Sequence, residues 1–416
     1  MRSFSSEKCW LVLLLSLCGL SAAHARPHEP LAHARVLERQ LDVVLEHLDD
    51  GQHREASAIL AGMARRFPES RLTHYLRAEL LRREFGGLAG NDLAQQQTGF
   101  GLLLEARSRL AALRARQQRE RSATERPGLL PATIIQTGKA VDEIVVVDVA
   151  GNTLYRVDDT GVLAEHYVSI GINGFGKRRE GDGKTPLGIY DIQTFRSDAS
   201  LPRLYGSGAL TLDYPNIVDR EQGRDGSGIW LHGVPHGQYS RAPQSSEGCV
   251  TMANQHLSDL ARTARPGTAR VILETVPRWH DAHERQLEQQ RFREQFRRYQ
   301  DAWRQADETT LAALYRNPAD VGSTLRQFGA AAGDAASLKR VSRPGAGLPG
   351  TEGSLIDRLI ALPAEDVTIL RYPNSDLVLM EARVGADPAS RLVLYWQRAD
   401  SGNWQIAHEI WMDKGI

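Results

Sequence analysis

The 416-residue chain has only three cysteines, and two of them, Cys9 and Cys18, lie in a predicted signal peptide. If that peptide is removed, Cys249 is the only thiol and cannot form an internal disulfide. A structural zinc site usually needs several Cys or His ligands, which argues against structural zinc at Cys249. Cys249 is therefore either a buried, inert thiol or a nucleophile.

Excess charge of one sign is absent, and so are long apolar runs. Lys plus Arg and Asp plus Glu both number 51, so no global field attracts nucleic acid. Residues 1–25 have the pattern of a secretory signal: Arg2 and Lys8 precede an apolar run, and Ala23-His24-Ala25 offers a cleavage site. That run is short for a bilayer, and no other segment approaches transmembrane length. We expect a mature protein outside the cytoplasm, without stable membrane insertion.

The residues around Cys249 favour a nucleophile. The apolar run Ile229–Leu231 predicts the end of a buried strand, which would project His232, 17 positions before the cysteine, as a base. Gly233 lets the chain turn away, and Gly248 can adopt positive φ and help aim backbone amides at a reacting carbonyl. A catalytic thiolate needs both a base and oxyanion donors.

This stretch resembles the L,D-transpeptidase (YkuD-type) family, whose signature is His-Gly followed by Ser/Thr-x-Gly-Cys. The matching positions are His232, Gly233, Ser246, Gly248 and Cys249. Further likeness to the family lies in Val145–Tyr155, in the Gly-Lys-Thr-Pro segment Gly183–Tyr190, and in Leu212–Asp219, a Tyr-Pro-Asn segment typical of the YafK-like branch. The resemblance covers residues 130–276, a predicted mainly-β catalytic domain. The chain departs from the common pattern at Glu247 and Thr251, positions that bear on the acyl acceptor.

The resemblance implies a periplasmic enzyme that acts on peptidoglycan stem peptides without a cofactor. Cys249 would form a thioester, with His232, oriented by a backbone carbonyl, as its base and Gly233 beside it. The implied substrate or oxyanion positions are Gly248, Ser246, Tyr214 and Lys184. An amine acceptor would make the enzyme an L,D-transpeptidase. Water would make it an L,D-carboxypeptidase or an amidase, and a non-catalytic peptidoglycan-binding scaffold is a further alternative.

Two other motifs are rejected. Gly183-Lys184-Thr185 suggests a phosphate-binding loop, but Arg178 stands where such a loop needs glycine, and Pro186 obstructs the following helix. His232 and His236 have the spacing of a zinc pair on a helix, which the intervening glycine and proline prevent. The sequence therefore predicts no nucleotide and no metal site.

The flanking regions complete a multidomain chain. Residues 31–126 predict an α-helical N-terminal region whose first helices resemble a single tetratricopeptide unit; they would pack on the catalytic domain or mediate a homodimer. Its arginine-rich helix, Leu102–Arg119, is interpreted as a solvated face rather than a polyanion-binding patch. Residues 283–416 predict a long helix with an aromatic stripe, then four strands. That order resembles the cone-shaped α+β fold of the SnoaL and nuclear-transport-factor-two superfamily.

Overall fold

The computed structural model describes residues 29–68, 70–84, 128–236, 241–305, 307–327, 355–385, 387 and 390–412. The predicted signal peptide and the arginine-rich helix lie outside these ranges. Among the described residues, no helix is long and apolar enough to cross a membrane.

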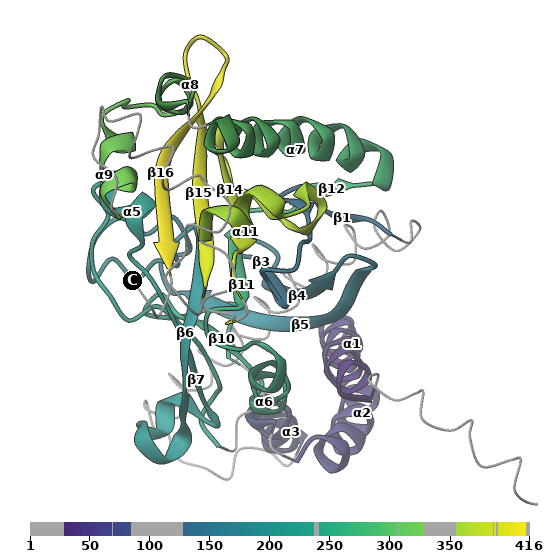
Figure 1. Cartoon of the computed structure of the whole chain (residues 1–416). Coiled ribbons are helices and arrows are strands. Elements are labelled where there is room, and N and C mark those ends of the chain that lie inside the picture. The colour runs from purple at the N-terminus through teal and green to yellow at the C-terminus, as the bar shows by residue number, and fades with distance from the viewer. Residues whose placement is uncertain are drawn as a thin grey trace, which may run out of the picture.

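Three N-terminal helices form the first layer, α1 (Glu29–Asp49), α2 (His53–Arg66) and α3 (Arg71–Glu84). Gly51, with φ of +73°, allows the turn between α1 and α2. Leu41 and Val44 of α1 are buried against Leu60 and Met63 of α2, as the helical periodicity predicts. Figure 1 shows α1 beside strand β5 (Gly161–Gly171). The predicted homodimer and the resemblance of these helices to a tetratricopeptide unit stay predictions.

The domain that the sequence predicts to be catalytic is built on a nine-stranded sheet, called the catalytic sheet below, with the order β10-β8-β7-β6-β11-β3-β4-β5-β9. A further pairing of β10 with β5 curls this sheet round. The strands are β3 (Glu143–Asp148), β4 (Thr153–Asp158), β5 (Gly161–Gly171), β6 (Gly188–Ser197), β7 (Gly208–Leu212), β8 (Trp230–His232), β9 (Gln244–Ser246), β10 (Val250–Met252) and β11 (Ala269–Glu274). Helices α5 (Ile217–Glu221) and α6 (Asn254–Thr263) and two short 3-10 turns, η1 (Asp198–Ser200) and η2 (Arg203–Tyr205), complete it. The β-rich domain confirms the sequence prediction, although β7, β9 and β10 were not foreseen.

The C-terminal region has helices followed by an antiparallel sheet. The helices are α7 (Ala282–Gln305), α8 (Glu308–Ala313), α9 (Asp320–Gln327) and α11 (Leu355–Ala361), followed by η3 (Ala364–Asp366), and the strands are β13 (Thr368–Arg371), β14 (Leu377–Arg383), β15 (Arg391–Arg398) and β16 (Trp404–Met412). The aromatic stripe of α7, at Phe292, Phe296, Tyr299 and Trp303, is buried in the core, as expected for an amphipathic helix. The cone shape stays a prediction.

One strand inside the range expected for the catalytic domain, residues 130–276, belongs instead to the C-terminal sheet. Strand β2 (Ile134–Gln136) pairs with β13, so the C-terminal sheet has five strands in the order β16-β15-β14-β13-β2. The short strands β1 (Leu130–Pro131) and β12 (Trp279–His280) pair with each other where the chain enters and leaves the catalytic domain.

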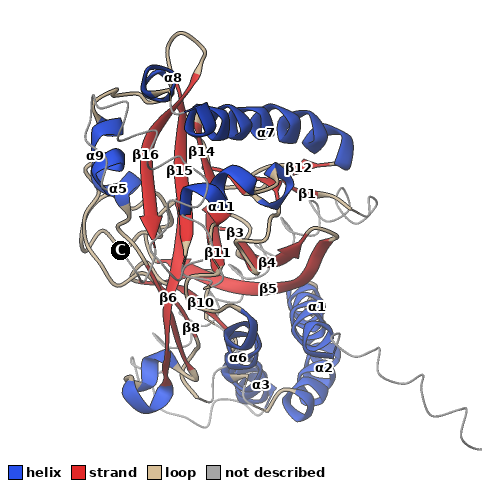
Figure 2. Ribbon diagram, in the orientation of Figure 1, coloured by secondary structure: helices blue, strands red, loops and turns tan. Residues whose placement is uncertain are grey.

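The C-terminal sheet lies between two hydrophobic cores. Val378 and Met380 of β14 face the core that α7 and α11 cover, whereas Leu379 faces a core shared with Ile144 and Ile272 of the catalytic sheet. Figure 2 shows α7 and α11 on the outer side of this sheet. Because strand side chains alternate between faces, one strand serves both cores. The two domains are therefore packed together through a continuous apolar layer.

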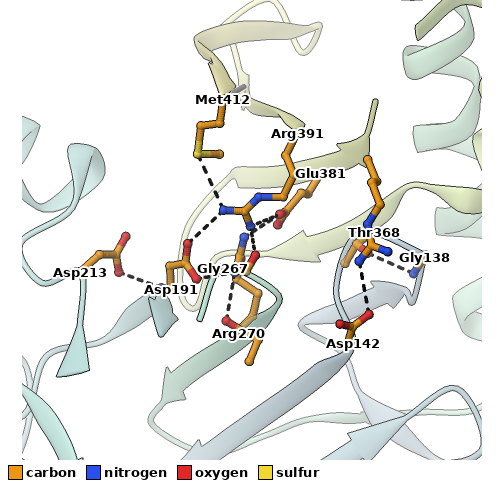
Figure 3. A network of polar contacts seen from close by, with 12 residues as sticks. Gly138, Asp142, Asp191, Asp213, Gly267, Arg270, Thr368, Glu381, Arg391 and Met412 are labelled. Atoms are coloured by element: carbon orange, nitrogen blue, oxygen red, sulfur yellow. Dashed lines mark hydrogen bonds and ion pairs between the residues drawn. The ribbon is translucent and has the colours of Figure 1, made fainter. Parts of the chain in front are cut away.

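Charged side chains cross the same interface (Figure 3). Arg270 of β11 donates to Asp191 Oδ1 at 2.7 Å and to Glu381 Oε1 at 2.6 Å, and Glu381 is fully buried. Arg391 of β15 donates to the same Glu381 oxygen at 2.6 Å and to Asp191 Oδ2 at 3.4 Å. Two guanidinium groups and two carboxylates thus join the catalytic sheet to the C-terminal sheet.

Candidate active site

The register of two short strands, β8 and β10, places Cys249 and His232 on the same face of the sheet. Strand β10 runs parallel to β8, with Val250 beside Leu231 and Thr251 beside His232. Val250 and Leu231 face the hydrophobic core. Because strand side chains alternate, Thr251 and His232 face the opposite side, and Cys249, directly before β10, precedes Thr251 by two positions on that side. The signature residues therefore gather on one face of adjacent strands.

The turn that carries the thiol is closed by Ser246 and Gly248. Ser246 Oγ donates to the Cys249 carbonyl at 2.5 Å and accepts from the Gly248 amide at 3.1 Å. Gly248 has φ of +133°, and a Cβ there would lie 2.8 Å from the Lys184 carbonyl oxygen. Thr185 Oγ1 donates to the Gly248 carbonyl at 3.0 Å and fixes the turn from the other side. The prediction of positive φ at Gly248 is confirmed.

A backbone carbonyl orients the imidazole of His232. Its Nδ1 donates to the Gly233 carbonyl at 2.7 Å, so Nε2 is left as the acceptor in the neutral ring. The Tyr205 ring packs edge-on at a centroid distance of 4.8 Å. Burial lowers the pKa of His232 to about 4, so the ring is neutral at neutral pH. The Gly233 carbonyl is thus a backbone partner of the kind that the family resemblance implies for this histidine.

Asn254, at the start of α6, holds the His-Gly segment in place. Its Oδ1 accepts from the amides of Ser207 at 3.0 Å and Val234 at 3.1 Å, and its Nδ2 donates to the Val234 carbonyl at 2.9 Å. A Cβ at Gly233 would lie 2.1 Å from Asn254 Oδ1, so only glycine fits there. Sequence reasoning missed Asn254, whose partners are distant in the chain.

The resting thiol is protonated. Cys249 is half-buried, and its Sγ donates to the Gly228 carbonyl at 3.2 Å. Burial raises the pKa of the thiol to about 11; the Glu247 carboxylate acts in the same direction, and the cations Arg241 and Lys177 oppose it. The site therefore holds a neutral thiol and a neutral imidazole rather than a thiolate–imidazolium pair.

Two of the expected oxyanion donors are already engaged. The Gly248 amide donates to Ser246 Oγ, and the Gly233 amide donates to the Gly208 carbonyl at 3.2 Å. Among the described residues the amide of Cys249 has no hydrogen-bond acceptor, so it is the amide at this turn that is left for an oxyanion. The roles of Gly233 and Gly248 are thus conformational: each permits a close approach that a Cβ would block.

The expectation that Tyr214 contacts the substrate does not fit its surroundings. The side chain is buried, its hydroxyl donates to the Asp225 carbonyl at 2.9 Å, and its ring packs edge-on against Tyr190 at 5.9 Å. The Tyr-Pro-Asn segment instead leads into α5, where Asn216 caps the helix by accepting from Val218 and Asp219 amides. Its role is structural. Lys184, by contrast, lines a pocket beside the turn formed by residues 246–249, which is called the nucleophile turn below.

An aromatic wall that sequence reasoning missed flanks the histidine. The rings of Tyr205 and Trp230 lie 5.2 Å apart, and the Arg196 guanidinium sits 5.3 Å from the Trp230 ring centroid. The positive charge of Arg241 lowers the pKa of both His232 and Cys249, which places it near both. Tyr205 lies outside the signature and Arg241 lies in the variable gap between its fixed positions, so no motif singled them out. Among the described residues, no group of three or more His, Cys, Asp or Glu side chains could hold a metal ion.

The comparisons with known proteins agree on the catalytic domain. Residues 142–273 match the family model of the YkuD L,D-transpeptidase catalytic domain. No curated protein sequence matches the chain significantly. The structure of Bd1075 from Bdellovibrio bacteriovorus is similar, with 23% identity, a TM-score of 0.50, and coverage of 68% of this chain and 98% of that one.

Two further structures show weaker likeness. The helical cell shape determining protein Pgp2 from Campylobacter jejuni shares 19% identity and a TM-score of 0.42, with coverage of 66% of this chain and 96% of that one. An L,D-transpeptidase from Mycobacterium smegmatis shares 16% identity and a TM-score of 0.22, with coverage of 32% of this chain and 58% of that one. At these identities the Bd1075 match shows a shared fold.

Proposed function

We propose that this chain, whose residues 142–273 form a YkuD-type L,D-transpeptidase catalytic domain, is a periplasmic cysteine acyltransferase that acts on peptidoglycan stem peptides. The observation that carries the proposal is the placement of Cys249 and His232 on one face of paired strands, with the imidazole oriented by the Gly233 carbonyl. A nucleophile, a base and a group that orients the base are the parts that thiol acyl transfer needs.

The reaction begins from the neutral pair. As Cys249 Sγ attacks the carbonyl of a diaminopimelate residue that precedes a terminal D-amino acid, its proton passes to His232 Nε2. The oxygen of the tetrahedral intermediate accepts a hydrogen bond from the Cys249 amide. His232 returns the proton to the departing amine as the carbon–nitrogen bond breaks, which leaves a thioester and a free D-amino acid.

The acceptor decides the second half of the reaction. An amine from a neighbouring stem peptide attacks the thioester, forms a new amide bond and regenerates the thiol, which gives a cross-link. Water as acceptor gives a free carboxylate instead, which is L,D-carboxypeptidase or amidase activity at the same site. His232 removes the proton from either acceptor, so the two reactions share every residue named above.

The test compares the mature protein with its Cys249→Ala variant on purified disaccharide tetrapeptide, with mass spectrometry of the products. Cross-linked dimers that only the parent forms would support the transpeptidase. Loss of one alanine with gain of water, again only in the parent, would assign L,D-carboxypeptidase activity. Identical traces from the two proteins would overturn the proposal and leave a peptidoglycan-binding scaffold, which sacculus pull-down would then test. An Arg265→Gln variant, changed at an exposed position outside the site, serves as the control for differences between protein preparations.

A further inference from the structure

The loop between β5 and β6 encloses a pocket beside the nucleophile turn. Its volume is about 560 Å³, and it is lined by Asn173, Gly176, Arg178, Arg179, Gly181, Asp182 and Lys184. Three of these side chains are cations and one is an anion. The whole chain carries a net charge of zero, so the positive charge in this pocket is a local concentration.

The carboxylate in the pocket lining, that of Asp182, accepts hydrogen bonds from groups of the loop itself. Asp182 accepts from the backbone amides of Arg178 at 2.8 Å, Arg179 at 3.2 Å and Lys184 at 3.1 Å, and from Lys177 Nζ at 2.9 Å. Burial alone would raise its pKa, but these donors outweigh burial and hold the pKa of Asp182 well below its usual range. Asp182 therefore stays ionised and is balanced by the buried Lys177.

The other three cations of the pocket form no salt bridge with any described residue. Within the described ranges, the side chains of Arg178, Arg179 and Lys184 form no ion pair, and Arg178 and Arg179 are exposed at the pocket. Asp182 accepts from the backbone amides of these same three residues, so it fixes the backbone from which the three cationic side chains emerge. A second anion entering the pocket would meet three unpaired positive charges.

The pocket is tied directly to the thiol. The Ile172 amide donates to the Ser246 carbonyl at 2.7 Å, and Thr185 Oγ1 donates to the Gly248 carbonyl at 3.0 Å. These two bonds bracket the pocket loop and hold it against the turn that ends at Cys249. A peptide whose carbonyl lies at the thiol therefore has the pocket within reach of its neighbouring groups.

We propose that Arg178, Arg179 and Lys184 form a carboxylate subsite that anchors the substrate peptide next to Cys249. The identity of the substrate rests on the proposed function; the recognition of a carboxylate rests on the pocket itself. Guanidinium groups match carboxylates with paired N–H donors, and two adjacent arginines offer two such forks. A stem tetrapeptide can supply a carboxylate at its terminal D-amino acid or on the diaminopimelate side chain.

Binding to the inactive Cys249→Ala protein tests the subsite without turnover. Isothermal titration calorimetry would measure the Kd for disaccharide tetrapeptide in the full mature chain, with and without the added pair Arg178→Gln and Arg179→Gln. Because hydrogen bonds to charged groups exceed neutral ones, we expect the added pair to weaken binding about tenfold. Arg265→Gln removes one exposed positive charge elsewhere and should leave Kd unchanged. Circular dichroism confirms that each variant is folded.

Two modified ligands identify the carboxylate. One tetrapeptide carries a C-terminal amide, and the other carries an amidated diaminopimelate side chain. Suppose that amidation of one carboxylate weakens binding to the protein that keeps both arginines but does not change the Kd of the protein with both glutamines. That carboxylate is then the one that the subsite binds. Equal Kd values with and without the arginines would overturn the proposal, as would absence of tetrapeptide binding. The proposal would also be overturned if the two Arg→Gln substitutions weakened binding equally for the unmodified tetrapeptide and for both amidated tetrapeptides.

These outcomes separate the subsite from the proposed function. If binding depends on the arginines but the parent protein with Cys249 forms no product, the acyl-transfer proposal is overturned and the carboxylate subsite stands. Cysteine-dependent product combined with arginine-independent binding would do the reverse.

Discussion

Glu381→Gln is expected to destabilise the packing of the catalytic domain against the C-terminal sheet. One oxygen of the fully buried Glu381 accepts from both Arg270 and Arg391, at 2.6 Å each. The substitution keeps the size and an acceptor oxygen but removes the charge, so the two buried cations keep only Asp191 as an ion-pair partner among the described residues. Removing one partner of a buried ion pair typically costs about 3–5 kcal/mol, and we expect a loss of about 3 kcal/mol because the neutral oxygen still accepts.

Urea unfolding followed by tryptophan fluorescence and by circular dichroism measures this loss. Two probes are needed because a multidomain chain need not unfold in one step. The matched control is Asp366→Asn, which removes the carboxylate of the more exposed ion pair with Lys139, formed at 2.8 Å with Lys139 largely solvent-exposed. An exposed pair is worth about 0–1 kcal/mol. A loss for Glu381→Gln as small as that of the control would refute the reasoning.

A double variant sharpens the same test. With Glu381→Leu and Arg391→Leu together, Arg270 keeps its 2.7 Å partner Asp191, and the buried charges balance again. Replacing a complete buried pair by apolar residues is often close to neutral, whereas an unbalanced charge is not. The double variant should therefore be more stable than Glu381→Gln alone. The opposite order would show that packing, not charge balance, dominates at this position.

Three further predictions concern the site and its surroundings. Gly248→Ala should abolish Cys249-dependent turnover and lower stability by about 1–3 kcal/mol, because φ is +133° and the Lys184 carbonyl lies 2.8 Å from the new Cβ; native folding with full activity would contradict this. Iodoacetamide should alkylate Cys249 at a rate that keeps rising to about pH 10, since burial raises the thiol pKa to about 11, and a plateau near pH 7 would refute a neutral thiol. Burial raises the pKa of Asp213 to about 7, so the folded state keeps a proton that the unfolded state releases near pH 4, and this group lowers stability as pH rises from 4 to 7. Between pH 5 and pH 8 the urea midpoint of Asp213→Asn should therefore shift less toward lower urea than that of the parent, and an identical shift in both proteins would contradict this.

The catalytic signature was predictable because its residues are close in sequence and their chemistry is distinctive. His232, Gly233, Gly248 and Cys249 can be matched to a pattern, and the carbonyl that orients His232 belongs to the next residue. Tyr214 shows where that approach fails. Its motif is real, but the motif's job is to cap α5 and fill the core, and only the packing around the side chain reveals this.

The site residues that sequence reasoning missed depend on long-range pairing. Asn254 acts on Ser207 and Val234, which lie 47 and 20 positions away, so no local pattern announces it. Strands β9 and β10 have three residues each, too few for a period-two signal to emerge. The interface network has the same character, because Arg270 and Glu381 are 111 positions apart.

Strand β2 makes the catalytic domain an insertion within the C-terminal fold. The edge of the last sheet is laid down at Ile134–Gln136, more than 200 residues before β13, with which it pairs. A C-terminal fragment that begins at α7 would lack this strand and expose the hydrogen-bonding edge of β13. An exposed edge of this kind can pair with strands of other molecules and cause aggregation. A fragment limited to the catalytic residues would uncover the apolar face of β3 and β11. Dissecting the protein by expressing its parts would therefore require cuts that keep β2 with the strands that follow residue 367, for example by circular permutation.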